Sequence, residues 1–253
     1  VGALDGAALA LAAQALLERH ASLRACFQHE QLGRPVQIIE ARVLAPWRTI
    51  DLSGFEEAER DQRLADILTQ DRAEHFDVAS APLLRFALIR LSTDRHRLVL
   101  THHHLLMDGW SAPVLVRELL APYGRQAEAL PQVTPYRDYL AFIARQDRDA
   151  ALTAWREALA GLEEPTRLAQ RAAGGGLVVP EQIILALEEG LSRNLSAAAR
   201  GQALTLNTMI QAAWAVLLGR LTGRDDVVFG VTVAGRPAEI AGVESMVGLF
   251  INT

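Results

Sequence analysis

The chain has 253 residues, 50% of them hydrophobic, which is enough to form a hydrophobic core. Its formal net charge of -5 argues against a general affinity for nucleic acid or anionic membranes. Its single cysteine, Cys26, excludes an internal disulfide and any zinc site built from several cysteines. All 25 basic residues are arginine, which excludes a Schiff-base lysine or a P-loop lysine as the reacting group.

The first hundred residues predict two helices and two pairs of strands. Asp5 can cap a first helix, because apolar residues follow it at helical spacing. Gly33 indicates a turn between two short strands, and residues 92–94 indicate the turn of a later hairpin. The expected elements are helices to about residue 18 and over 56–74, and strands over 23–28, 35–40, 83–91 and 96–103.

The remaining residues predict helices on either side of a linker. Ser111 can cap the helix that follows the strand over 96–103. Helical periodicity returns over 131–155 and is lost between Gly161 and Gly176, which makes this segment the best linker candidate. The elements expected beyond it are a strand over 182–187, helices over 191–200 and 205–221 with Gly223 as C-cap, and strands over 226–233 and 247–253.

The sequence carries no sign of a membrane or secreted protein. No apolar run approaches the roughly 20 residues that span a bilayer, and residues 1–4 lack the basic start of a secretion signal. We therefore expect a soluble cytoplasmic protein that binds neither membranes nor nucleic acid.

Three histidines, His102, His103 and His104, stand at the end of the strand expected over 96–103. They could form a metal site, a proton-transfer site, a buried polar cluster that only stabilises the fold, or part of a solvated loop. Because successive side chains of a strand point to opposite faces, three adjacent rings cannot converge on one point, which disfavours the metal site. The structural cluster and the proton-transfer site both remain open.

The residues after the histidines supply what proton transfer requires. A neutral imidazole acts near its unperturbed pKa of about 6.5 and needs a fixed orientation. Asp108 can anchor the loop through an arginine, and Gly109 lets the backbone approach a substrate without an intervening side chain.

Residues 103–109 read HHLLMDG and fit the pattern HHxxxDG, which resembles the condensation domains of nonribosomal peptide synthetases and their relatives in the chloramphenicol acetyltransferase superfamily. Three more segments resemble motifs of that family and follow in the same order. They are residues 19–24 (RHASLR), 136–139 (YRDY) and 247–253 (VGLFINT). Residues 234–236 read AGR where family members often carry Ser-Gly-Arg.

The resemblance implies an α/β fold, a mixed-sheet sandwich of the two-lobed chloramphenicol acetyltransferase type. We expect an N-terminal lobe over 1–165, a linker over 166–180 and the beginning of a C-terminal lobe over 181–253. The family's Ser-x-x-Gln segment before the first helix is absent from the sequence, and so is everything that follows the asparagine-bearing motif at residues 247–253. We therefore expect a fragment that holds one lobe and the opening of the second.

The resemblance also assigns roles to the motif residues. His104 is expected to point into the substrate channel as a general base or as a hydrogen-bonding group that orients the attacking amine, with His103 packed behind it. Asp108 is expected to pair with Arg19 or Arg24 and so to hold the loop in shape.

Four other residues complete the predicted site. Gly109 is expected to present its backbone N–H to a developing oxyanion. The residues expected to line the channel are Trp110, Ser111 and Asn252, while Tyr136 and Tyr139 are expected to pack between the lobes.

The implied reaction is amide formation between two thioesters held on the phosphopantetheine arms of a donor and an acceptor peptidyl carrier protein. No metal and no cofactor of the domain's own is expected, and an adenylation domain is expected in the same polypeptide. Three alternatives stay open: an epimerisation domain, a recruitment domain without chemistry, and an unlinked acyltransferase that uses coenzyme A or a free amine or alcohol.

Overall fold

The computed structural model of the chain describes residues 4–29, 33–123, 130–168 and 183–253. The chain divides into two compact units, one made of Val1–Gln146 with Thr232–Thr253 and the other of Asp147–Val231. The bounds of these units are not those of the predicted lobes. Most of the linker predicted over 166–180 lies outside the described residues, so the division into two lobes stays a prediction.

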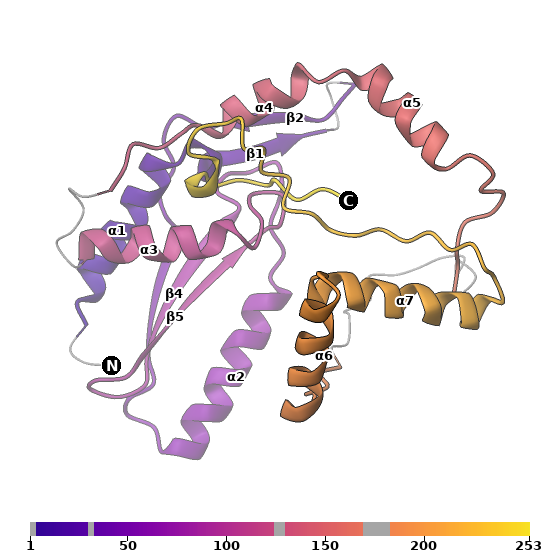
Figure 1. Ribbon diagram of the computed structural model, residues 1–253. Coiled ribbons are helices and arrows are strands. Elements are labelled where there is room, and N and C mark those ends of the chain that lie inside the picture. The colour runs from indigo at the N-terminus through magenta and orange to yellow at the C-terminus, as the bar shows by residue number, and fades with distance from the viewer. Residues whose placement is uncertain (1–3, 30–32, 124–129, 169–182) are drawn as a thin grey trace. The chain divides into compact units, whose positions relative to one another are not determined.

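The first unit contains two small sheets (Figure 1). In the first sheet, β1 (Ala25–Gln28) pairs with β2 (Val36–Ile39) in antiparallel orientation, and both strands lie within the segments predicted as strands. The second sheet has the order β3–β4–β5, in which β3 (Trp47–Asp51) is parallel to β4 (Leu84–Arg90) and β4 is antiparallel to β5 (His96–His102).

The helix α2 (Glu57–Ala73) connects β3 to β4, as a crossover between parallel strands requires. Strand β3 was missing from the predicted elements. Its side chains are half-buried or exposed in an order that does not alternate, so the segment gives no period-2 hydrophobic signal.

The core of the first unit lies between one face of this sheet and two helices, α1 (Gly6–Arg19) and α3 (Ser111–Tyr123) (Figure 1). Asp5 caps α1 by accepting hydrogen bonds from the backbone of Ala7 and Ala8, both at 3.0 Å. The buried side chains of this core include Leu9, Leu16 and Leu17 of α1, Val114, Leu115 and Leu119 of α3, and Leu84, Phe86 and Leu88 of β4. The short helix η1 (Ala21–Arg24) joins α1 to β1.

A smaller cluster joins α4 (Tyr136–Ala144) to the C-terminal segment. Tyr139 packs there against Phe250, with ring centroids 4.6 Å apart, and Met246 is fully buried beside them. The short helix η3 (Val243–Ser245) contributes Val243. The C-terminal segment, residues 232–253, is therefore part of the first unit. It reaches the loop after β5, residues 103–110, which we call the motif loop.

The described part of the second unit contains three helices, α5 (Arg148–Ala158), α6 (Glu189–Gly201) and α7 (Leu206–Thr222). The C-cap of α7 is Gly223, as predicted, with a left-handed φ of 67° that suits glycine. No helix in the described residues is long and apolar enough to cross a membrane.

The structure corrects four of the predicted elements. The helix expected over 131–155 is broken, because Asp147 caps a new helix by accepting a hydrogen bond from the backbone of Ala150 at 2.9 Å. No strand forms over 183–187, 226–233 or 247–253 in the described residues, where the only pairing is an isolated bridge between Val233 and Asn252. These segments have strand-like composition but no neighbouring strand with which to share backbone hydrogen bonds.

Candidate active site

The histidine run lies where β5 leaves the sheet. The last paired residue is His102, and the backbone N–H of His103 still donates to Leu83 O at 2.9 Å. His104 follows in a turn and its side chain is exposed, whereas the two preceding rings are half-buried. Among the described residues, no group of three histidine, cysteine or acidic side chains is placed to hold a metal ion.

Two of the three rings have tautomers fixed by the backbone. His103 Nδ1 accepts a hydrogen bond from the backbone N–H of Leu105 at 3.1 Å, so the proton of the neutral ring is on Nε2. His102 Nδ1 lies 3.3 Å from the carbonyl of His103, to which it can only donate. Burial lowers the pKa of His102 below its usual value, and the charges that His104 and His103 can carry lower it further. His102 is therefore neutral near pH 7.

The carboxylate of Asp108 is almost completely buried, at 1% exposure, and caps α3. Its Oδ1 accepts from the backbone N–H of Ser111 at 3.0 Å and from the Ser111 hydroxyl at 2.8 Å. Its Oδ2 accepts from the backbone N–H of Phe250 at 3.1 Å. The cap of α3 is therefore Asp108, whereas the sequence had predicted Ser111.

Ser111 has another role than the one predicted for it. Its side chain is fully buried, and its hydroxyl, which donates to Asp108 Oδ1, accepts from the N–H of Gly248 at 3.2 Å and lies 3.0 Å from the carbonyl oxygen of the same residue. The prediction that Ser111 lines the channel is corrected, because the residue is fully buried and its hydroxyl bonds Asp108, Gly248 and Arg236.

The arginine that pairs with Asp108 is Arg236, with Nη2 3.3 Å from Oδ1, and both side chains are at most 2% exposed. Arg236 Nη1 also donates to the carbonyls of Val243 at 2.5 Å and Met246 at 3.0 Å, and its guanidinium lies 3.8 Å from the centroid of the Phe250 ring. Sequence reasoning missed Arg236 as a site residue. The available signal was the AGR segment over 234–236, which differs only in its first residue from the Ser-Gly-Arg that family members often carry.

The glycine before this arginine is required by its conformation. Gly235 has a left-handed φ of 60°, and a Cβ added to it would lie 1.9 Å from the carbonyl oxygen of Phe250. The close approach of the backbones of Gly235 and Phe250 places Arg236 next to Asp108.

Arg19 and Arg24 do not pair with Asp108, and the prediction that one of them does is wrong. Arg19 Nε and His20 Nε2 both contact Glu118 Oε2 at 2.7 Å, which ties the end of α1 to α3. Arg24 donates to backbone carbonyls, among them that of Leu17 at 2.9 Å. Both arginines are near the end of α1, and their hydrogen bonds are satisfied there.

Glu118 is a buried carboxylate, 2% exposed. Burial alone would raise its pKa, but the hydrogen bonds and charges of His20 and Arg19 hold the pKa of Glu118 below its usual value. The carboxylate is therefore ionised at neutral pH and stabilises the contact between α1 and α3.

The other predicted site residues are partly exposed. Gly109 is exposed, and a Cβ added to it would meet no atom within 4 Å. Trp110 is 51% exposed and donates from Nε1 to the carbonyl of Glu244 at 3.1 Å. Asn252 is exposed and its side chain accepts from the backbone N–H of Thr253 at 2.9 Å. The channel roles of Trp110 and Asn252 stay predictions.

Tyr136 packs on the C-terminal segment close to the motif loop. Its hydroxyl donates to the carbonyl of Leu249 at 2.5 Å, and its ring leaves no room for a side chain at Gly248. Burial raises the pKa of Tyr136 to about 12. The motif over 136–139 therefore supports the segment that bonds Asp108.

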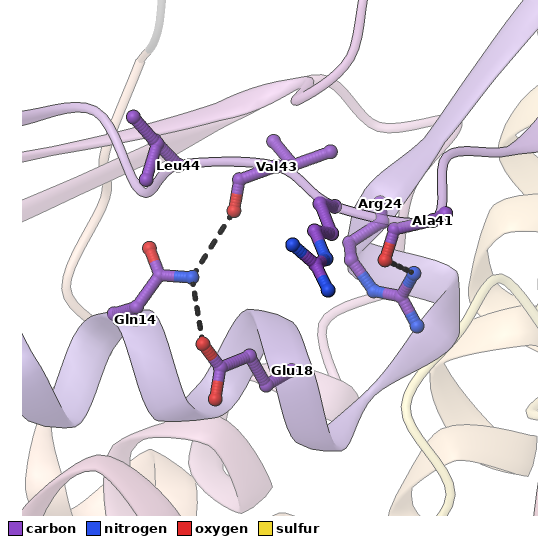
Figure 2. Close-up of a pocket in the computed structure, with 7 residues that line it drawn as sticks. Gln14, Glu18, Arg24, Ala41, Val43 and Leu44 are labelled. Carbon is purple, nitrogen blue, oxygen red and sulfur yellow. Dashed lines mark hydrogen bonds between the residues drawn. The ribbon is translucent and has the colours of Figure 1, made fainter.

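A cavity of about 520 Å³ lies between α1 and residues 41–44 (Figure 2). Gln14 connects its walls by donating to Glu18 Oε1 and to the carbonyl of Val43, both at 3.1 Å. Arg24 donates to the carbonyl of Ala41 at 3.0 Å at the other end. None of the lining residues belongs to the HHxxxDG motif, so this cavity is not the candidate active site.

The comparisons with known proteins agree with the four motifs. The family model of the condensation domain matches residues 1–253, and the chain belongs to this family. It is 42% identical over its whole length to one of the linear gramicidin synthase proteins of Brevibacillus parabrevis, and 34% identical over 99% of its length to surfactin synthase subunit 3 of Bacillus subtilis. The chain spans 3% and 20% of these two relatives.

Solved structures show the same fold. The crystal structure of SgcC5 from Streptomyces globisporus matches 99% of the chain with a TM-score of 0.76 and 26% identity. The first condensation domain of the calcium-dependent antibiotic synthetase also matches 99% of the chain, with a TM-score of 0.72 and 27% identity. The chain spans 58% and 60% of these two proteins, and the α/β fold predicted from the sequence is confirmed.

Gly235→Ala should destabilise the first unit more than Gly33→Ala does. Both glycines have φ near +60°, at 60° and 66°, so both variants carry a left-handed strain of about 1–2 kcal/mol. Only Gly235→Ala also collides with a carbonyl, which adds roughly 1–3 kcal/mol, whereas a Cβ at Gly33 meets nothing within 4 Å. Urea unfolding of the two variants measures the difference, and equal losses would contradict the packing of Gly235 on Phe250.

Glu118→Gln should lose stability in a pH-dependent way. Because the folded-state pKa of Glu118 is lowered, its contribution is fully present above the unfolded-state pKa of about 4.3 and is lost as the pH falls through the folded value. The difference in unfolding free energy between the parent and Glu118→Gln should therefore be largest near pH 7 and shrink below about pH 4. Glu57→Gln, at a side chain 82% exposed, is the matched control and should show little difference at either pH. A difference for Glu118→Gln that does not change with pH would contradict the assignment.

Proposed function

We propose that the chain provides the histidine motif of a condensation domain that forms peptide bonds in a nonribosomal peptide synthetase. The observation that carries the proposal is the complete HHxxxDG motif, with the exposed ring of His104 at the end of β5 and the loop after it fixed by Asp108. Membership of the condensation family supports it.

In the proposed reaction, the amino group of an acceptor aminoacyl thioester attacks the thioester carbonyl of a donor aminoacyl or peptidyl group. A carbon–nitrogen bond forms, the carbon–sulfur bond breaks, and the sulfur leaves as a thiol that takes up one proton while the amine loses one. Both substrates are held on phosphopantetheine arms of carrier proteins, so much of the rate enhancement comes from proximity. The proposed partners are therefore a donor and an acceptor carrier protein, with an adenylation domain in the same polypeptide. The domain supplies no cofactor of its own.

His104 is the proposed catalytic residue. Across the described residues its ring takes part in no hydrogen bond, whereas His103 Nδ1 is occupied by the backbone of Leu105. A free, exposed imidazole can bind the attacking amine, accept its proton, or hydrogen-bond to the tetrahedral intermediate. His103, with its tautomer fixed, supports the loop from which His104 projects.

Gly109 is the proposed place where substrate approaches the backbone. Gly109 is exposed, and a Cβ added to it would meet no atom within 4 Å, so packing of the fold does not require a glycine at this position. Its backbone N–H lies at the entry of α3, where the positive end of the helix dipole favours a developing oxyanion.

His104→Ala should lower peptide transfer between two loaded carrier proteins by about 100-fold or more, the scale of a lost proton-transfer group. The assay is intact-mass detection of the peptide on the acceptor carrier, with the complete protein. His75→Ala, at another exposed histidine, is the control and should retain full activity. Transfer by a folded His104→Ala variant within a few-fold of the parent would remove this residue from the mechanism.

Gly109→Ala should separate function from folding at the motif. The added methyl group meets no atom of the chain, so the midpoint of urea unfolding should stay close to that of the parent. Peptide transfer should fall by about 10-fold or more, because the methyl group occupies the space proposed for substrate. A variant with full activity would show that the reacting groups do not approach this backbone.

A further inference from the structure

Asp71 is a buried carboxylate outside the motif, 4% exposed, in the last turn of α2. Its side chain bonds all three strands of the second sheet. Oδ1 accepts from Arg48 Nη2 of β3 at 2.8 Å and from Arg85 Nε of β4 at 2.9 Å, and Oδ2 accepts from the hydroxyl of Thr101 of β5. The side chain of a single residue therefore fixes the three strands relative to one another and to α2.

Thr101 is the residue of β5 that this carboxylate holds, and it stands directly before the histidine run. The register pairs Thr101 with Arg85, so the two side chains lie next to each other on the face of the sheet that α2 covers. The bond to Asp71 is thus a side-chain anchor of β5 two residues before His103 and three before His104.

The side of β5 that faces α2 is open at this end of the strand. A cavity of about 460 Å³ lies between α2 and β5, lined by Leu68, Asp71 and Arg72 on one side and by residues 97–102 on the other. Because this cavity leaves little apolar packing between α2 and the end of β5, the hydrogen bond from Thr101 to Asp71 joins β5 to α2 there, in addition to the pairing of β5 with β4.

The charge of Asp71 is retained at neutral pH. Burial alone would raise the pKa of Asp71, but the hydrogen bonds from Thr101 and Arg85 hold it below its ordinary value. Arg85 also donates to the carbonyl of Glu74 at 3.0 Å, so it joins β4 to the C-terminal end of α2 as well.

We propose that Asp71 is a positioning residue for the motif histidines and that it acts through Thr101, whose hydroxyl it holds at the end of β5. The inference rests on the proposed function, in which the ring of His104 must meet a tethered amine. A displacement of about 1 Å at a reacting group can cost up to about 100-fold in rate.

Thr101→Val tests the proposal in the complete protein with both carriers loaded. The variant replaces the hydroxyl by a methyl group of similar size and leaves the bonds from Asp71 to Arg48 and Arg85 in place. We expect kcat to fall roughly 10- to 100-fold, with little change in KM for the carriers. Thr101→Ser keeps the hydroxyl and should therefore keep kcat close to that of the parent. Thr49→Val, the same substitution in β3, is the matched control and should keep kcat at the level of the parent.

Hydrogen exchange provides a measurement that does not depend on activity. The loop after β5 is held by backbone N–H groups of His103, Leu105 and Leu106, which donate to Leu83 O, His103 Nδ1 and His103 O. In Thr101→Val these three amides should exchange several-fold faster than in the parent, and in Thr49→Val they should not.

The two measurements distinguish the inference from the function on which it rests. If the parent protein transfers no peptide, the proposed function fails and the proposed role of Asp71 in positioning the reacting histidine fails with it, while faster exchange would still show that Asp71 holds the loop. If the parent is active, unchanged kcat or unchanged exchange in Thr101→Val overturns the proposal. A loss of kcat in Thr101→Val that also occurs in Thr101→Ser or in Thr49→Val overturns the proposal as well.

Discussion

The two oxygens of the Asp108 carboxylate accept hydrogen bonds from parts of the chain that are far apart in the sequence: the start of α3, the guanidinium of Arg236 and the backbone of Phe250. A carboxylate removed from water in this way costs several kcal/mol unless its lone pairs are satisfied and its charge is paired. The lone pairs of Asp108 are satisfied and its charge is paired only when residues 232–253, which contain Arg236 and Phe250, lie against the motif loop. The position of the loop that contains His104 and Gly109 therefore depends on this buried charge.

Two further buried carboxylates act in the same way in the first unit. Glu118 joins the end of α1 to α3 through Arg19 and His20, and Asp71 joins α2 to all three strands of the second sheet through arginines and a threonine. Each carboxylate contacts an arginine, and the chain has no lysine. A guanidinium suits this role because its planar set of donors can bond a carboxylate and backbone carbonyls at the same time.

The local elements of the first unit were largely predictable from the sequence. The apolar runs on either side of the turn at residues 92–94 located β4 and β5 to within a residue or two, and Asp5 marked the start of α1. In the second unit, Gly223 marked the end of α7. Strand β3 could not be found, because its side chains are mostly at the surface and carry no periodic signal. The strands expected over 226–233 and 247–253 failed for the opposite reason, since apolar composition was present without a pairing partner in the described residues.

The candidate site was predictable in its residue types but not in its contacts. The motif identified the histidines, Asp108 and Gly109, whereas the arginine partner of Asp108 was sought near α1 and lies 128 residues further along the chain. Spacing along the sequence carries no information about such a contact. The signals that were available are the AGR segment and the glycine at 235, whose left-handed backbone and close approach to Phe250 become visible only in the structure.

A double-mutant cycle tests most directly whether Arg236 is the residue that holds Asp108. The unfolding free energies of Asp108→Asn, Arg236→Met and the double variant give the coupling energy between the two side chains, and a parallel cycle with Arg19→Met serves as the reference. The structure predicts a coupling of roughly 1–3 kcal/mol for Asp108 with Arg236 and close to zero for Asp108 with Arg19. A coupling that is absent for Arg236, or as large for Arg19, would contradict the central role of the Asp108 carboxylate and its partner.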